Sequence, residues 1–483
     1  MSNGERITLL SSQQKTLIDH LESHPEGHER AAIVLFRRLH ILIDEFENSD
    51  RYIAQEVIPL ESSWITDSSP THISFKVEPF RKLFRKCEEE KLVFGFVHNH
   101  PLGLEAFSQI DDENERTLFT AIRNRNGNEI SFVSMIWANR KWLARTRHGT
   151  DPDTAFPVRH TLVISDRLHL YGYKESSTEH AEVQARQAAA FGKPLVDMLQ
   201  SLRVGIVGCG GTGSPLATLI ARAGIGELVL IDDDVLERSN LNRVRGLTAK
   251  DVDDSKATKL KEFIDNIGVS VKVAAFEAKI DESPQALDAL ASCDVVFGCT
   301  DDFIGREVMN TALYVYVQLL IDVGLGGKVC EGFDGQPTLR YHFGRISCIM
   351  PESGQCLFCQ GILHNTWIRT QFERRKNPDL SEEEMKEKYL EDGDTDAPGV
   401  GPFTSAAADF AVATLFDLVK PYRSFPPEIR KDFFKIDFVK MEISSHLTDG
   451  DPDCQYCYVK HFLLLKESNR LNRPILGKRD EYT

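Results

Sequence analysis

The stretch that decides the fold of this chain is Val204-Gly-Ile-Val-Gly208-Cys-Gly210-Gly211-Thr-Gly213. It places a Gly-x-Gly-x-x-Gly spacing between an apolar run and a segment rich in alanine and leucine. Glycines let the backbone turn tightly and approach a phosphate, while the start of the next helix offers unpaired N–H groups to an anion. The stretch therefore predicts the strand, turn and helix that open a doubly wound α/β sheet.

A second apolar run, 228–231, ends on three consecutive carboxylates, Asp232, Asp233 and Asp234. At the end of the second strand of such a sheet, a carboxylate can accept hydrogen bonds from ribose hydroxyls. The two features together predict a Rossmann-like nucleotide site. Taken alone, they fit an NAD-binding dehydrogenase as well as an enzyme that uses ATP.

Length and composition limit the classes of function. A chain of 483 residues is too long for one ordinary domain, so two or three are expected. The formal net charge of −16 argues against nucleic-acid binding, because no basic block offsets it. No stretch approaches the roughly 20 uninterrupted apolar residues of a membrane span, and the first residues show no signal core. We therefore expect a cytoplasmic protein that contacts neither nucleic acid nor membrane.

A candidate metal site follows the strand-like run 92–97. The run leads directly into His98-Asn-His100, and Ser108 and Asp111 follow. Alternate residues of a strand point to the same face, so the two histidines can bind one ion together. Asp111, at the start of a predicted helix, adds an oxygen ligand and leaves a position open for water, which suits a catalytic zinc ion. The alternative is a pair of surface histidines at a strand end.

The His-x-His-Pro and Ser-x-x-Asp pattern resembles the JAMM motif of the JAB/MPN metalloproteases, an α+β family that cleaves peptide or isopeptide bonds after ubiquitin-like C-termini. The resemblance implies that Ser108 helps to hold the attacking water. It also implies a glutamate, just before the first central strand, that activates this water. Glu29 occupies that place, and Glu56 is the second choice. The strand after Glu29 departs from the family pattern because it lacks a glycine.

The motifs after the glycine loop resemble those of the ThiF/MoeB/E1 superfamily, which adenylates the C-terminal glycine of ubiquitin-like or sulfur-carrier proteins with Mg·ATP. Ser239-Asn240-Leu-Asn-Arg243 is similar to the Ser-Asn-Leu-x-Arg signature, whose residues contact the phosphates. Lys256 matches a lysine that neutralises phosphate charge, and Asp301 matches an aspartate that holds Mg²⁺. A dehydrogenase has no need of these residues together, so the resemblance favours ATP.

The same resemblance implies a homodimer. Arg186 matches, with a different spacing to the glycine loop, an arginine that reaches the γ-phosphate across the dimer. Val244 stands where many members have glutamine. The residues expected around the nucleotide are Gly208, Gly210, Gly211, Gly213, Asp232, Asp234, Asn240, Arg243, Lys256, Asp301 and Arg186.

Two Cys-x-x-Cys pairs, Cys356 with Cys359 and Cys454 with Cys457, stand out among the ten cysteines. Without an export signal, such pairs predict metal ligands rather than disulfides. Four thiolates form a closed tetrahedral zinc site, which is a structural arrangement. The distant pairing is similar to that of the superfamily, where this zinc holds the returning chain against the adenylation domain.

A nucleophilic cysteine is missing from its usual place in the superfamily. Many members carry one in the crossover loop, just before a Gly-Val-x-Gly element, where Asp394, Thr395 and Asp396 stand here. Cys330 and Cys348 follow the strand expected under the substrate groove, and a structural role suits them better. A thioester step therefore has no residue assigned to it.

The hydrophobic periodicity predicts the other elements. Helices are expected at 5–23, 77–91, 111–123, 179–202, 381–390 and 404–420, and strands at 31–36 and 51–60. Prolines and few apolar residues at 146–160 predict a boundary. We therefore expect a JAB/MPN-like domain over 1–150, a linker or domain edge over 151–178, and a Rossmann-like adenylation domain over 179–483.

These features favour a two-headed enzyme of ubiquitin-like-protein metabolism, of the kind found in bacterial conjugation systems, some of them antiphage. The zinc hydrolase would process or remove the ubiquitin-like protein, and the second domain would adenylate its exposed glycine. Fusion would raise the local concentration of that tail, and an E2-like protein is a further partner of such systems. The alternatives are a sulfur-carrier adenylyltransferase that leads to a thiocarboxylate, and a scaffold that only binds a ubiquitin-like protein.

Overall fold

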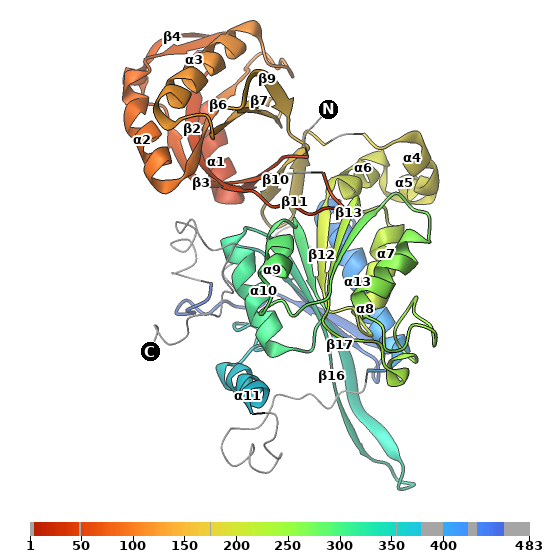
Figure 1. The fold of residues 1–483 in the computed structure, drawn as a ribbon. Helices are drawn as coiled ribbons and strands as arrows, with labels where there is room; N and C mark the ends of the chain where they lie inside the picture. The colour runs from red at the N-terminus through yellow and green to blue at the C-terminus, as the bar shows by residue number, and fades with distance from the viewer. Residues whose placement is uncertain are drawn as a thin grey trace. The chain divides into compact units, whose positions relative to one another are not determined.

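The computed structural model describes residues 4–47, 50–173, 175–353, 355–377, 399–423 and 432–457. The chain divides into two compact units, Met1–Glu175 and Ser176–Thr483. Each unit is built around a β-sheet of its own (Figure 1). The expected helix at 381–390 and the positions Asp394, Thr395 and Asp396 lie outside the described residues.

Unit 1 contains a mixed sheet that has nine strands in the described part of the chain. In spatial order these are β11 (Leu168–Tyr171), β10 (His160–Ile164), β1 (Arg6–Leu10), β3 (Arg51–Pro59), β2 (Ala31–Leu39), β6 (Leu92–Asn99), β7 (Ser131–Ala138), β8 (Lys141–His148) and β9 (Asp151–Pro157). A separate small ribbon pairs β4 (Ile65–Ser69) with β5 (His72–Phe75).

Helices cover both faces of this sheet. Leu17 and Leu21 of α1 (Ser11–Leu21) join the hydrophobic core on one face. The core on the other face includes side chains of α2 (Arg81–Glu90) and α3 (Gln109–Asn126). A sheet whose two faces are apolar needs such cover on each side. This arrangement fixes α3 above the strands that carry the histidine motif.

Residues Arg6–Leu10 form β1, although the periodicity predicted a helix over 5–23. β1 pairs in parallel with both β3 and β10, and all of its residues are buried. A strand buried on both faces does not show the alternation that reveals a half-exposed strand, which explains the error. The helix begins at Ser11, where the side chain of Gln13 accepts a hydrogen bond of 2.9 Å from the backbone N–H of Leu10.

The prolines at 146–160 lie in an edge strand and do not mark the predicted boundary. β9 is the last strand of the sheet, and it contains Pro152 and Pro157. An edge strand tolerates proline because one side of its backbone needs no ladder donor. β10 then pairs with β1 on one side and with β11 on the other. The strands at 151–171 therefore belong to unit 1, and the division falls after Glu175.

Unit 2 contains a sheet that has eight strands in the described residues, five of them parallel. The parallel strands, in spatial order, are β14 (Lys272–Phe276), β13 (Glu227–Ile231), β12 (Arg203–Val207), β15 (Val295–Gly298) and β16 (Leu319–Glu331). The antiparallel strands β17 (Pro337–Ile349), β18 (Phe433–Asp437) and β19 (Glu442–His446) extend the sheet beyond β16.

The helices of unit 2 cover both faces of its sheet. Figure 1 shows α7 (Gly213–Arg222), α8 (Lys256–Asp265) and α13 (Gly401–Val419) on one face, and α9 (Pro284–Ala291) and α10 (Phe303–Val315) on the other. The chain passes from β12 outward to β13 and β14, and then returns to β15 on the opposite side of β12. At such a switch point the loops diverge and leave a crevice at the carboxyl ends of the strands. The glycine loop follows β12 at this point.

The helical pattern predicted over 179–202 is divided into three helices, α4 (Thr178–Val183), α5 (Ala185–Phe191) and α6 (Lys193–Ser201). Gly192, with φ +87°, separates the last two, and Pro194 lies in the first turn of α6. A further helix, α11 (Asn365–Lys376), lies against α10. α13 is long and apolar enough to cross a membrane, with a mean hydropathy of 1.3. It packs instead on α7, β16 and β17, as a core helix does.

Candidate functional site

Two glycines in the glycine loop of unit 2 lie where the backbone leaves no space for a side chain. Gly208 has φ +93°, and a Cβ there would lie 2.7 Å from the backbone of Cys299 at the end of β15. A Cβ on Gly213 would overlap the carbonyl oxygen of Gly208. At Gly210, by contrast, a Cβ would meet nothing within 4 Å. The loop is therefore tight on its protein side and open at Gly210, before the first turn of α7.

Asp232 faces the same loop from the end of β13. Its carboxylate accepts hydrogen bonds from the backbone N–H groups of Cys209 and, at 2.8 Å, Asp234. Burial raises the pKa of Asp232 to about 6, against the opposing effect of these two hydrogen bonds. Lys256, buried at the start of α8, donates a hydrogen bond of 2.8 Å to Asp234. The expected ribose carboxylate and phosphate lysine are thus linked through Asp234.

Arg243 lies beside the glycine loop and against Gly399. A Cβ on Gly211 would lie 2.9 Å from its Cδ, and a Cβ on Gly399 would lie 3.3 Å from the same atom. Its guanidinium donates to the carbonyl oxygen of Ser239 at 2.9 Å. Asn240 is buried, and its side-chain oxygen accepts a hydrogen bond of 3.3 Å from the backbone N–H of Glu237. Asn240 therefore also shapes the short turn that carries Arg243.

Asp301 follows β15 and is exposed, without a hydrogen bond or ion pair among the described residues. Its neighbour Asp302 caps α10 and forms an ion pair of 2.7 Å with Arg375 of α11. Arg375 could not be identified from the sequence, because no motif marks an ion pair between such distant segments. Arg186 is exposed on α5 and has no partner in the described part of the chain. No hydrogen bond or ion pair in that part of the chain joins Arg186 to the glycine loop.

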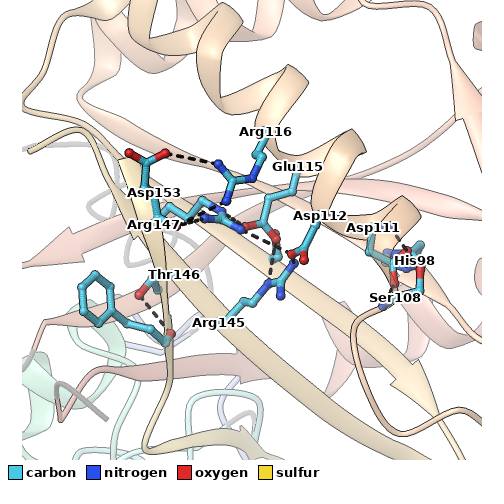
Figure 2. A network of polar contacts seen from close by, with 12 residues as sticks. His98, Ser108, Asp111, Asp112, Glu115, Arg116, Arg145, Thr146, Arg147 and Asp153 are labelled. Carbon is cyan, nitrogen blue, oxygen red and sulfur yellow. Dashed lines mark hydrogen bonds and ion pairs between the residues drawn. The ribbon is translucent and has the colours of Figure 1, made fainter. Parts of the chain in front are cut away.

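The histidine motif of unit 1 forms a compact cluster. His98 Nε2 lies 2.9 Å from Asp111 Oδ1, His100 Nε2 lies 3.2 Å from Asp111 Oδ2, and the two Nε2 atoms are 3.1 Å apart. Figure 2 shows Asp111 beside His98 and Ser108. Ser108 caps α3: its hydroxyl oxygen accepts from the Asp111 N–H at 3.2 Å, and its own N–H donates to Asp111 Oδ2.

The donor set of this cluster fits a zinc ion. Tetrahedral zinc with bonds of about 2.0–2.1 Å to nitrogen and oxygen separates neighbouring donors by roughly 3.3 Å, close to the observed 2.9–3.2 Å. The Nδ1 of His100 lies 2.8 Å from the Leu104 carbonyl oxygen, so it carries the proton and leaves Nε2 free as a ligand. Burial opposes ionisation of Asp111, but the neighbouring imidazoles of His100 and His98 hold its pKa below the usual range.

Glu29 lies just before β2 and is 2% exposed. One of its carboxylate oxygens has no hydrogen-bond partner among the described residues. Burial raises its pKa to about 7; the nearby His100 lowers the pKa and Asp111 raises it. Glu56, the second choice, lies on β3 and forms an ion pair with Lys86. The structure therefore brings Glu29, and not Glu56, into the electrostatic environment of the histidine cluster.

The four cysteines of the two Cys-x-x-Cys pairs also converge. Neighbouring Sγ atoms lie 3.6–3.8 Å apart, which is too far for a disulfide bond of about 2.05 Å. Zinc–sulfur bonds of about 2.3 Å in a tetrahedron separate the sulfur atoms by roughly 3.8 Å. The four thiols therefore fit a structural zinc ion. Cys348 is buried in β17, and Cys330 is partly buried in β16, as suits the structural role predicted for them.

The comparison with protein families decides the class of unit 2. The model of the ThiF family matches residues 184–457, which is more than half of the chain. This chain belongs to the ThiF family. The predicted ThiF/E1-like domain with its Rossmann-like α/β fold is thereby confirmed. The family match begins at Gln184, between α4 and α5, and reaches the last of the four cysteines.

Relatives of this ThiF-family chain include named adenylating enzymes. A SAMP-activating enzyme E1 of Haloferax volcanii is 34% identical over 165 residues, which cover 33% of this chain and 54% of the relative. A sulfur carrier protein ThiS adenylyltransferase of Escherichia coli is 36% identical over 152 residues, 31% of this chain and 58% of the relative. The chain thus spans less than two thirds of the length of these relatives. The structure of E. coli MccB with ATP covers 59% of this chain and 75% of that chain, at 21% identity and a TM-score of 0.42.

Proposed function

We propose that unit 2 uses ATP to adenylate the C-terminal carboxylate of a small carrier protein. The observation that carries this proposal is the convergence of the glycine loop, Asp232, Lys256 and Arg243 at the switch point of the sheet. The membership of this chain in the ThiF family supports the same conclusion. A free carboxylate resists nucleophiles, whereas an acyl adenylate has AMP as a good leaving group.

Each group of residues around the nucleotide has a separate role in the proposed reaction. The N–H groups of the loop and of the first turn of α7 bind the phosphates, while Asp232 accepts hydrogen bonds from the ribose. A carboxylate oxygen of the carrier attacks the α-phosphorus, and the bond to the β-phosphate oxygen breaks, giving acyl adenylate and pyrophosphate. Lys256 and Arg243 neutralise charge on the departing pyrophosphate. Mg²⁺ bound at Asp301 would neutralise phosphate charge further.

The carrier is a ubiquitin-like or sulfur-carrier protein that ends in glycine. The relatives named above support this class, because their names specify SAMP and ThiS as what they activate. We assign the product to ubiquitin-like conjugation and keep a sulfur-carrier adenylyltransferase as the second candidate, favoured by the same relatives. The product formed from the acyl adenylate distinguishes the two functions. A conjugate or thioester indicates ubiquitin-like conjugation, whereas a thiocarboxylate formed after addition of sulfide indicates a sulfur-carrier adenylyltransferase.

Carrier-dependent ATP–pyrophosphate exchange tests the adenylation directly. We expect exchange only when a carrier with a free C-terminal glycine is present, and its loss in Lys256→Ala. The same carrier with its terminal glycine removed is the matched control. Exchange that does not depend on the carrier, or that survives in Lys256→Ala, would overturn the assignment.

We further propose that unit 1 is a zinc hydrolase of the JAB/MPN type. The observation that carries it is the cluster of His98, His100 and Asp111 beside the buried, unpartnered oxygen of Glu29. A zinc ion bound by the cluster would supply Lewis acidity to a water molecule and to the scissile carbonyl. Glu29, whose pKa of about 7 suits a general base at neutral pH, takes the proton of that water and passes it to the leaving amine. The Ser108 hydroxyl donates a hydrogen bond to the developing oxyanion.

A pocket of about 320 Å³ adjoins the cluster, with His100, His28 and Trp137 in its walls. Its volume suits one or two residues of an extended peptide next to the scissile bond. We propose that the substrate is the same carrier protein, as a precursor or a conjugate. The two activities then act on one C-terminus, first to expose it and then to activate it.

Metal analysis and cleavage of fusions to the cognate carrier test the hydrolase. We expect two zinc ions per chain in the wild-type protein and one in His98→Ala, which should no longer cleave. Cleavage by His98→Ala at the wild-type rate would overturn this assignment and leave the adenylation untouched.

We also propose that the enzyme acts in the cytoplasm as a homodimer. In this dimer Arg186 of one subunit approaches the glycine loop of the other. An E2-like protein is the proposed next acceptor.

A further inference from the structure

α3 carries two residues of the proposed hydrolytic centre, Ser108 as its N-cap and Asp111 in its first turn. The first turn of a helix is held weakly by the backbone alone, because its N–H groups lack intrahelical partners. A metal ligand, however, has to be held within about 0.5 Å of its working position. The helix therefore needs an anchor outside its own backbone.

An ion network behind the first turn supplies contacts of this kind (Figure 2). Glu115, one turn after Asp111, is almost fully buried and accepts hydrogen bonds from Arg145 Nε at 2.9 Å and from Ser134 at 2.5 Å. Its second oxygen is paired with Arg147. Arg145 and Arg147 belong to β8, and Ser134 to β7. The network thus connects α3 to two neighbouring strands of the sheet.

Arg145 also contacts both flanks of the segment that holds the site residues. Its guanidinium carbon lies 3.8 Å from the centre of the Phe107 ring, immediately before Ser108. Its Nη2 is paired with Asp112, immediately after Asp111. A planar guanidinium can stack on a ring and form two ion pairs at once, which an ammonium group cannot do. One side chain therefore spans 107–115.

We call the contacts of Arg145 with Phe107, Asp112 and Glu115 the clamp. The pairing of the strands places this clamp relative to the histidines. Ser134 of β7 is paired with Phe96 of β6, two residues before His98. The charges of Asp112 and Glu115 are balanced by those of Arg145 and Arg147. Asp111 is thus left as the carboxylate of this turn that faces the histidines. Breaking the clamp should change the position of Asp111 relative to His98 without changing any ligand atom.

We propose that Arg145 is a positioning residue of the metal centre in unit 1, which holds Ser108 and Asp111 against the histidines through Phe107, Asp112 and Glu115. The inference rests on the proposed zinc hydrolase and adds a residue outside its motif. Partners that hydrogen-bond a metal ligand directly contribute about 10–100-fold in metal affinity. Arg145 acts on Asp111 through its neighbours, so we expect the lower end of that range.

The test is Arg145→Lys in the full chain, which keeps the positive charge of the buried network but removes the planar fork. Arg116→Lys is the matched control, because Arg116 lies on the same helix and pairs with Asp153, whose side chain is largely exposed. Cobalt(II) is the probe: a thiolate site gives intense charge-transfer absorption, and a histidine–carboxylate site gives only weak visible bands. The four-cysteine site therefore reports the folding of unit 2 in the same sample. Tryptophan fluorescence reports the folding of unit 1, because Trp64, Trp137 and Trp142 lie there.

We expect Arg145→Lys to bind cobalt about 10-fold more weakly at the histidine–carboxylate site, with the thiolate bands unchanged. Arg116→Lys should bind as the wild-type protein does, within about twofold. Wild-type affinity in Arg145→Lys would overturn the clamp and leave the metal centre standing. Cobalt bound by the wild-type protein only at thiolates would overturn the centre, and the clamp with it.

Discussion

Replacing Gly213 with alanine tests the packing of the glycine loop in unit 2. A Cβ at this position would overlap the carbonyl oxygen of Gly208 and lie 2.8 Å from its carbonyl carbon. It would also lie 3.3 Å from the Cβ of Cys299. Contacts under 3.0 Å are essentially never seen for real Cβ atoms. The atoms in the way belong to the backbone, so no side-chain rotation can relieve the clash.

The magnitude follows from this geometry. Over-packing that side chains can relieve costs about 1–3 kcal/mol, and here the loop itself must move. We therefore expect a loss of about 3 kcal/mol or more in the free energy of unfolding. The movement displaces the N–H groups that would bind the phosphates, so the Kd for ATP should rise more than tenfold, or about 1.4 kcal/mol.

Gly210→Ala, three positions earlier in the same loop, is the matched control. A Cβ there meets no protein atom within 4 Å, so stability should change by less than about 0.5 kcal/mol. The methyl group would still occupy the open side of the loop, and ATP binding should weaken. Urea unfolding and calorimetric titration with ATP measure both quantities. Wild-type stability in Gly213→Ala would refute the loop geometry, and unchanged ATP affinity in Gly210→Ala would refute the position of the phosphates.

Three further predictions concern the metal and charge sites. Cys454→Ser should release one zinc per chain and lower the melting temperature, because structural zinc binding contributes folding free energy; unchanged zinc content and melting would contradict the four-cysteine site. ATP affinity should fall about fivefold as the pH drops from 7 to 5, because Asp232, with its pKa of about 6, loses its charge. The ATP affinity of Asp232→Asn, measured over the same pH range, reports the pH dependence that comes from the nucleotide itself. An equal change of affinity with pH in both proteins would exclude Asp232 as the cause. Glu29→Gln should slow cleavage by at least about 100-fold while keeping zinc, whereas loss of zinc would identify Glu29 as a ligand.

Sequence spacing was sufficient where a site is built from short segments. The glycine loop lies between one strand and one helix, so its spacing already determines the local geometry. The same holds for His98 and His100, which are alternate residues of a single strand end. Cys356 and Cys359 likewise form one turn, and only their pairing with a distant second turn required the resemblance to a family.

Contacts that depend on strand order could not be predicted from the sequence. β1 is buried between two parallel strands, so its residues carry no alternation to distinguish them from a helix. The pairing of Arg375 with Asp302 joins segments about 70 positions apart, and that of Arg145 with Glu115 depends on the register of β8. Ion pairs of this kind have no sequence pattern, because almost any charged residue can take part in them.

The position of β1 has a consequence for how unit 1 is completed during translation. β1 ends at Leu10, whereas its neighbour β10 begins at His160. At roughly 5–20 residues per second, β1 is synthesised about 8–30 seconds before the strand that pairs with this edge of it. An unpaired strand edge is a template for association with other chains, so the nascent unit passes through an aggregation-prone stage. A fragment that stops at residue 150 would keep this open edge permanently, and the segment to produce in isolation therefore extends through β11.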